Sequence, residues 1–139
     1  MVLSDADIIE RVGNDSLIIE PYDEDNVEPA SVDLRLGEDF KTVMRTYQSK
    51  PIDTRTEDNH LRYEEIEGEA LTIHPGQFVL TTTLERVALP DDIVGEVLGR
   101  SSLGRLGISV HQTAGYIDPG FEGEITLELS NHGPAPVTL

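Results

Sequence analysis

The sequence predicts a mainly β fold, a distorted jelly-roll barrel preceded by one short helix. Short apolar stretches recur along the second half of the chain, and Gly and Pro turns separate them. Helical periodicity is confined to the residues before Gly13. Many short strands at this spacing are typical of a sandwich or a jelly roll. The 139 residues can bury a core without disulfides, and we expect one domain over residues 1–139.

The expected N-terminal helix rests on a capping pattern. Ser4-Asp5-Ala6-Asp7 resembles a capping box, in which the first and last side chains bond to each other's backbone N–H. Ile8, Ile9 and Val12 then form a short apolar stripe, and Gly13 ends it. The pattern predicts a helix of about two turns.

After this helix the chain is expected to form strands and loops. Charged, turn-rich sequence from residue 38 to residue 69 predicts a long surface excursion, irregular in part, over 49–69. The stretch 134–139 begins another apparent strand and stops, so we expect either a partner on that edge or a longer parent chain. The expected strands are Leu17–Ile19, Val32–Leu36, Leu71–Ile73, Phe78–Leu84, Ile93–Leu98, Ile108–Val110 and Glu124–Leu129.

Composition limits the possible partners and the compartment. The 27 acidic and 10 basic residues leave a net charge of -17, which argues against non-specific binding to nucleic acid or to a membrane surface. The chain has no cysteine, so thiol catalysis and cysteine-ligated zinc are excluded. No stretch approaches the roughly 18 apolar residues of a membrane span, and the acidic N-terminus is unlike a signal peptide, so we expect a cytoplasmic protein.

The acidic excess also has two interpretations. With only two lysines among the basic residues, it is typical of a protein adapted to high salt, where carboxylates keep the surface hydrated. An ordinary acidic protein is the alternative. The four histidines are too scattered in sequence to predict a metal site.

Two segments carry candidate chemistry. In Gly99–Gly107, two arginines and two serines lie among glycines, a composition suited to phosphate oxygens or to a tight surface turn. In His111–Glu128, an aromatic residue beside a glycine turn could stack on a base, and Asp118 could accept from a sugar hydroxyl. Glu128 lies between Leu127 and Leu129 on the polar face of an expected strand, where a carboxylate is either solvated or, in a pocket, able to transfer protons.

Together these segments resemble the motifs of the dCTP deaminases, a branch of the trimeric dUTPase-like family. The pair GRSSLGRLG (99–107) and AGYIDPGFEGEITLE (114–128) is highly specific. An earlier segment, EPASVDLRLG (28–37), matches the first motif of the family, and IHPG (73–76) and TLE (83–85) follow in order. The resemblance covers nearly the whole chain. It implies a dUTPase-like jelly roll, a homotrimer with active sites between subunits, and dCTP as the substrate.

The resemblance also implies roles for individual residues. Glu128 would be the catalytic acid/base that activates a water for attack on cytosine C4, with Ser101 and the backbone of Ala114 orienting that water. Arg105 would lie near Glu128 and the base. Mg²⁺ would accompany the triphosphate, and zinc would not be used. The implied substrate-binding residues are Arg100, Ser101, Ser102, Leu103, Gly104, Arg105, Ala114, Asp118, Thr126 and Leu127.

Within that set, Arg100 and Ser102 would contact the triphosphate, Asp118 the deoxyribose 3′-hydroxyl, and Thr126 and Leu127 the edge of the base. The family also has a C-terminal part with further phosphate contacts, which would begin just after Leu139. Its absence from this sequence leads us to expect a fragment of a longer chain.

The resemblance leaves the final product open. The main expectation is deamination of dCTP to dUTP and ammonia. Residues 113–118 also resemble the bifunctional subgroup, which releases dUMP and pyrophosphate. A dUTPase without deaminase activity is disfavoured, because dUTPases have an apolar residue in place of Glu128. A non-catalytic nucleotide-binding trimer is the remaining alternative.

Overall fold

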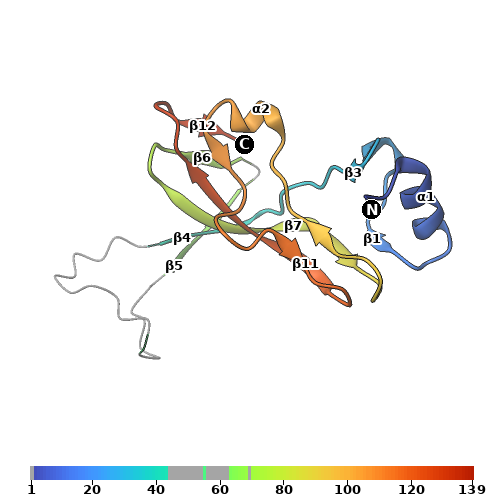
Figure 1. Ribbon diagram of the computed structural model, residues 1–139. Helices are drawn as coiled ribbons and strands as arrows, with labels where there is room; N and C mark the ends of the chain where they lie inside the picture. The colour runs from blue at the N-terminus through green and yellow to red at the C-terminus, as the bar shows by residue number, and fades with distance from the viewer. Residues whose placement is uncertain (1, 44–54, 56–62, 69) are drawn as a thin grey trace.

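The computed structural model describes residues 2–43, 55, 63–68 and 70–139 (Figure 1). The described residues are mainly β, with one N-terminal helix, as the sequence predicted. One six-stranded antiparallel sheet and three two-stranded sheets are present among them. These sheets do not close into a barrel in the described part of the chain, and they are consistent with a distorted jelly roll.

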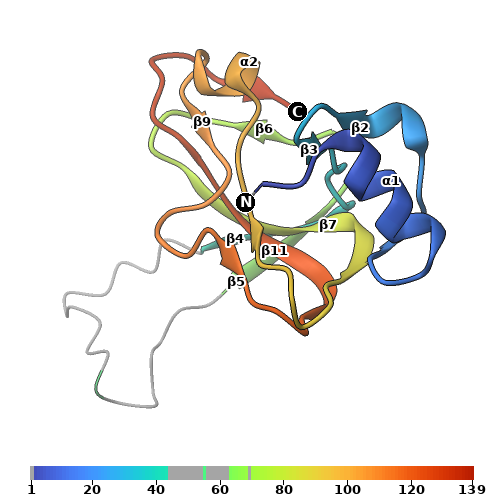
Figure 2. The same ribbon diagram turned by 45° about the vertical axis from the view of Figure 1, so that its right-hand side comes forward.

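Two long strands, β7 (Phe78–Ala88) and β11 (Glu122–Asn131), form the centre of the larger sheet. They cross the middle of the molecule side by side in both views (Figures 1 and 2). Their antiparallel register places Glu128 opposite Leu80 and Thr126 opposite Thr82. A register shift between Glu124 and Thr126 bends the second strand. The sheet runs in the order β5 (Tyr63–Glu67), β4 (Asp39–Val43), β7 (Phe78–Ala88), β11 (Glu122–Asn131) and β9 (Ile108–Ser109), with β1 (Ile18–Glu20) also pairing with β7.

The three small sheets hold the connecting segments in place. The expected C-terminal strand exists, and it pairs with the strand near residue 72. Two of the expected strands are much shorter than the sequence predicted, at 32–36 and at 93–98. In the first, the chain leaves the β2–β3 ladder after Val32 and meets β7 at an isolated bridge between Leu36 and Thr83. The pairs are β2 (Val27–Glu28) with β3 (Ser31–Val32), β8 (Gly95–Glu96) with β10 (Tyr116–Ile117), and β6 (Thr72–Ile73) with β12 (Val137–Thr138).

The sequence predicted no strand in the charged stretch 38–69, and the described residues contain two. Residues 39–43 and 63–67 form a ladder in which Phe40 lies opposite Ile66 and Lys41 opposite Glu65. The buried Phe40 ring joins this hairpin to the core, and Lys41 pairs with Glu65 at 3.8 Å. A single aromatic anchor and one cross-strand charge pair are too weak a pattern to predict a strand in such polar sequence. Apart from Arg55, the middle of the excursion lies outside the described residues.

The N-terminal helix α1 (Asp5–Gly13) confirms the capping prediction. The Asp7 N–H donates to Ser4 Oγ at 3.3 Å, and the Ser4 N–H donates to Asp7 Oδ2 at 3.0 Å. Ile8 packs with Leu17 and Ile19 of the neighbouring strand into a small second core. Ile9 does not join them and is exposed, because a short amphipathic helix buries only one stripe of its surface. A 3₁₀ turn, η1 (Glu24–Asn26), follows β1 along the chain and precedes β2.

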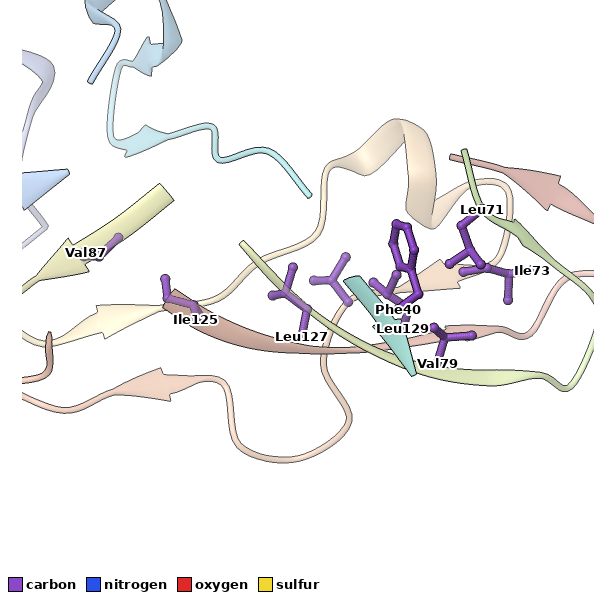
Figure 3. Close-up of a cluster of buried hydrophobic side chains, with 9 residues drawn as sticks. Phe40, Leu71, Ile73, Val79, Val87, Ile125, Leu127 and Leu129 are labelled. Atoms are coloured by element: carbon purple, nitrogen blue, oxygen red, sulfur yellow. The ribbon is translucent and has the colours of Figure 1, made fainter. Parts of the chain in front are cut away.

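The main core lies against one face of the β7–β11 pair (Figure 3). Ile125, Leu127 and Leu129 are buried, whereas Glu124 and Thr126 are exposed and Glu128 is half-buried. The alternation predicted for 124–129 is therefore confirmed. Because side chains alternate along a strand, the buried leucines place Glu128 on the opposite face of the sheet, away from the core.

One carboxylate is nearly completely buried next to the core. Glu85 on β7 is 2% exposed. Its two oxygens accept from the Arg35 backbone N–H at 2.8 Å and from Arg35 Nε at 2.7 Å. A buried carboxylate is tolerated when it is paired and hydrogen-bonded in this way. The pair attaches the segment 33–37 to β7, which matters for the site because Asp33 lies in that segment.

We expect the stability of the protein to rise with salt, because the charge of -17 repels itself at low ionic strength. Raising KCl from about 0.1 M to about 1 M shortens the screening length from about 10 Å to about 3 Å. Exposed pairs such as Arg11–Asp92, joined at 2.8 Å, will weaken, but such surface pairs contribute little. Melting curves across a KCl series at fixed protein concentration measure the effect. A flat or falling melting temperature would show that the acidic surface is no adaptation to salt.

Candidate functional site

The first candidate segment contains a short helix, where the sequence suggested a loop or tight turn. α2 (Ser101–Gly104) is one helical turn, and Arg100 precedes it in an extended conformation. The Leu103 and Gly104 N–H groups donate to the Arg100 carbonyl at 3.0 Å, and this closes the turn. Ser101, Ser102, Gly104 and Arg105 are all exposed, and Leu103 is half-buried. Two hydroxyls and two guanidinium groups are therefore presented to solvent on one small element.

Among the described residues, Arg100 forms an ion pair with Asp33. Its Nη2 lies 3.2 Å from Asp33 Oδ2, and its side chain is 67% exposed. Two exposed donors on a guanidinium can form a paired contact with phosphate oxygens. The ion pair with Asp33 is in the open and is weak enough to be exchanged for a ligand. Asp33 was not singled out from the sequence, because nothing in DLRLG (33–37) shows which distant residue its carboxylate meets.

Glycines place α2 against the end of β11. Gly107 has a φ of +89°, in the left-handed region that favours glycine. A Cβ added to Gly107 would lie 2.3 Å from the Gly133 nitrogen, and one added to Gly133 would lie 2.3 Å from the Leu106 carbonyl oxygen. The His132 N–H donates to the Gly107 carbonyl at 2.7 Å across this contact. Two backbones approach directly here, so the position of α2 depends on these two glycines.

Glu128 is held on the polar face of β11. Its backbone N–H donates to the Val110 carbonyl at 2.9 Å. Its carboxylate Oε2 accepts from the Gln112 backbone N–H at 2.9 Å. A half-buried carboxylate with one oxygen held and no cation bound to it among the described residues is a suitable acceptor for a proton from water. The prediction for Glu128 named the residue from the sequence, but it missed Gln112, whose contact comes from the backbone.

The second candidate segment forms a loop and a turn around β10. Gly115 is packed against the ring of His111, and an added Cβ would lie 3.0 Å from Nε2. Ala114 and Asp118 are exposed on either side of this point. The Phe121 N–H donates to the Asp118 carbonyl at 3.1 Å, with Gly120 at a φ of +77°. Tyr116 is largely exposed, so an aromatic face is available beside the glycine turn.

The predicted site residues form two groups within one chain. Arg100 to Arg105 surround α2, whereas Glu128 lies near Gln112 and shares the polar face of β11 with Thr126. Leu127, on the other face, is buried in the core. In the described part of the chain, no ion pair or hydrogen bond joins either arginine to Glu128. We expected Arg105 to lie near Glu128, but no hydrogen bond or ion pair joins these two described residues within one chain.

Behind Arg100 lies a cavity of about 190 Å³ with mostly apolar walls. Asp33 and Arg100 are at its rim, and Leu127, Leu129 and Leu139 contribute to its lining. Its wall also includes Gly99 and Leu103 from the α2 segment. The cavity therefore connects the arginine segment to the main core.

Among the described residues, no three His, Cys, Asp or Glu side chains are grouped so that they could hold a metal ion. Within the same residues, no helix is both long and apolar enough to cross a membrane.

Comparison with known proteins identifies the family. A protein of Methanobrevibacter smithii, "dCTP deaminase, dUMP-forming", is 50% identical over 143 residues, which cover 99% of this chain and 73% of that protein. The "dCTP deaminase" of Haloarcula marismortui is 52% identical over 145 residues, covering 100% of this chain and 74% of that protein.

A solved structure has a similar fold. The crystal structure of 2'-deoxycytidine 5'-triphosphate deaminase from Agrobacterium tumefaciens superposes with a TM-score of 0.75 at 28% identity. The match covers 99% of this chain and 42% of the crystallised one, so this chain spans less than half the length of that protein. Residues 2–139 also match the family described as dCTP deaminase-like. The chain thus belongs to the dCTP deaminase-like family.

Proposed function

We propose that this protein deaminates dCTP to dUTP and ammonia. The observation that carries the proposal is Glu128, a half-buried carboxylate on the polar face of a strand, with one oxygen bonded to the Gln112 N–H and no cation paired to it. Relatives named for this reaction are about half identical to the chain over nearly its whole length, which supports it. Localisation in the cytoplasm stays a prediction.

In the proposed reaction, Glu128 acts as the acid/base for hydrolysis at cytosine C4. Its carboxylate takes a proton from a water as the water oxygen bonds to C4. As the C4–O bond forms, the electron pair of the C4–N3 double bond moves to N3. The protonated carboxyl then passes its proton to the 4-amino nitrogen, the electron pair returns from N3 as the bond from C4 to the amino nitrogen breaks, and ammonia leaves. The remaining hydroxyl proton moves to N3, which gives uracil. Ser101 and the backbone at Ala114 would orient the water and the amino group. The reaction consumes one water and needs no redox partner.

The rest of the nucleotide would be held by the two exposed segments. Arg100 and Ser102 would bind the triphosphate, with Leu103, Gly104 and Arg105 completing that loop. Asp118 would accept from the 3′-hydroxyl. Thr126 and Leu127 would read the edge of the base, through their backbone groups. Zinc is not needed in this scheme, since the carboxylate activates the water.

Magnesium fits this arrangement as part of the substrate complex. Hydroxyl and guanidinium donors surround α2, and the described residues have no cluster of ligands for a bare metal ion. Phosphate oxygens would therefore carry the ion, and it would neutralise part of the triphosphate charge. The residues of this chain would bind the phosphates and orient the base.

We further propose a homotrimer with active sites between subunits. In the described part of the chain no hydrogen bond or ion pair joins Glu128 to Arg100 or Arg105, which flank α2, and this favours a site completed by a second copy. Sedimentation and light scattering would measure the assembly. A monomer that turns over dCTP at full rate would contradict it.

A second candidate reaction is release of dUMP and pyrophosphate after deamination. It is favoured by residues 113–118, which resemble the bifunctional subgroup, and by the similarity of the chain to relatives named "dCTP deaminase, dUMP-forming". Incubation with dCTP and Mg²⁺, followed by chromatography, separates the two outcomes. A dUTP peak supports deamination alone, a dUMP peak supports the bifunctional reaction, and unchanged dCTP with a folded protein would contradict both.

We expect replacement of Arg100 by Gln to weaken dCTP binding about 10-fold to 100-fold, because a charged hydrogen bond contributes about 1.5–3 kcal/mol. Binding of deoxycytidine should change little, since it has no phosphate. Titration calorimetry with both ligands measures the difference. Arg11→Gln is the control, as that arginine pairs with Asp92 on the surface near α1. Equal weakening of dCTP and deoxycytidine would mean that Arg100 has a structural role.

A further inference from the structure

A cluster of polar side chains lies close to Glu128. Its members come from β9, from the end of β11 and the residue that follows it, and from the loop between β9 and β10. We call it the Gln112 cluster, and it consists of Ser109, Gln112, Ser130 and His132. Gln112 Nε2 lies 2.8 Å from Ser130 Oγ, 3.2 Å from Ser109 Oγ and 3.3 Å from the Glu128 carbonyl oxygen. The two serine hydroxyls are 2.9 Å apart. Ser130 Oγ is also 2.8 Å from His132 Nε2.

Gln112 contacts both the side-chain carboxylate and the backbone carbonyl of Glu128. Its backbone N–H donates to the carboxylate, and its side-chain amide reaches the carbonyl oxygen of the same residue. The amide has two hydrogens and three acceptors within reach, and Ser130 is the closest. Gln112 itself is exposed, whereas the Ser130 hydroxyl to which it bonds belongs to a residue that is only 8% exposed.

The loop around Gln112 has little other support from the backbone. Outside the helices and strands, the backbone hydrogen bonds of the described residues include Val110 and Gly115 but none at 111–114. The side-chain amide of Gln112 is therefore the main contact that holds this loop against β11. The loop in turn carries the Gln112 backbone N–H. If that attachment were lost, the donor to Glu128 Oε2 would move with the loop.

We propose that Gln112 is a positioning residue for Glu128, an inference that rests on the proposed deamination. A general base has to be held within about 0.5 Å of its productive position. The carboxylate of a glutamate rotates freely unless a donor fixes it, and the Gln112 N–H supplies that donor. Gln112 does not touch the reacting atoms in this scheme. It acts through the orientation of Glu128.

The primary test is Gln112→Met, which keeps the length of the side chain and removes its donor. We expect kcat for dCTP to fall about 10-fold, within the roughly 100-fold loss that a 1 Å misplacement of reacting groups can cause. The KM for dCTP and the melting temperature should stay close to those of the unsubstituted protein. Gln77→Met is the control, because the Gln77 side chain also holds a loop, where its Oε1 accepts from the His74 N–H at 3.0 Å, and that loop is a different one.

A second variant tests the anchor without changing Gln112. Ser130→Ala removes the shortest contact of the amide, and we expect a smaller fall in kcat of about 2-fold to 3-fold. The double variant should be no slower than Gln112→Met alone, because the two residues act through one contact. Multiplied losses, or normal kcat in Gln112→Met, would overturn the proposal. If Gln112→Met does not fold, normal kcat in Ser130→Ala overturns it.

The same assays separate this inference from the proposed function. Normal turnover of dCTP by Glu128→Gln would overturn the role of Glu128, and with it the reason to position it. An inactive Glu128→Gln together with a fully active Gln112→Met would overturn the positioning role alone.

Discussion

Replacing Glu128 with Gln is expected to lower the rate of ammonia release from dCTP by at least about 100-fold, the lower range for loss of a general base. The amide has almost the same shape as the carboxylate, and its oxygen can still accept from the Gln112 N–H, which lies 2.9 Å away. It cannot take a proton from water at neutral pH. Binding of dCTP should therefore change by no more than about 3-fold, a small effect on this scale.

The measurements are a coupled assay for ammonia and calorimetric titration with dCTP. Glu124→Gln is the matched control: Glu124 is on the same strand and the same polar face, exposed, with a contact of 3.3 Å from Thr82 Oγ1. It should keep its turnover. Near-normal turnover in Glu128→Gln would exclude this carboxylate as the acid/base, and equal losses in both variants would indicate a general effect of charge on the strand.

The second large effect is expected from Gly107→Ala. The residue has a φ of +89°, which costs about 1–2 kcal/mol with a side chain. Its new Cβ would lie 2.3 Å from the Gly133 nitrogen, and crowding of this kind typically costs a further 1–3 kcal/mol, roughly. We expect the free energy of unfolding to fall by about 2–5 kcal/mol in total. Because the backbones must separate, α2 should move away from β11, and dCTP binding should weaken too.

Urea unfolding at fixed protein concentration measures the loss, since an oligomer gains stability with concentration. Gly13→Ala is the control, because nothing lies within 4 Å of its added Cβ. That variant should unfold within about 1 kcal/mol of the unsubstituted chain, the range of a helix-propensity change. If Gly107→Ala were equally stable, the close contact between the two backbones would not determine the position of α2.

Local chemistry along the chain was enough to predict several elements. The capping box of α1 forms because Ser4 and Asp7 are three residues apart, and such a contact needs no other part of the molecule. The buried face of β11 follows from strict alternation at Ile125, Leu127 and Leu129. That same alternation put Glu128 on the polar face, and the resemblance to the dCTP deaminases implied its catalytic role.

Tertiary contacts decided what the pattern could not. The strands at 39–43 and 63–67 pair because Phe40 reaches the core, although their sequence is as polar as a loop. The α2 turn lies against the end of β11 because Gly107 and Gly133 allow two distant backbones to touch. Sequence spacing contains no information on contacts of this kind.

The candidate site divides along the same line. The ability to bind phosphate or to transfer a proton is a property of individual side chains. The sequence therefore shows it directly, in GRSSLGRLG (99–107) and at Glu128. Asp33 beside Arg100, the buried pair of Arg35 and Glu85, and the Gln112 N–H on Glu128 bring together residues 16 to 67 positions apart in the sequence. A backbone donor has no side-chain signature at all, so only the folded chain shows that Gln112 holds the carboxylate.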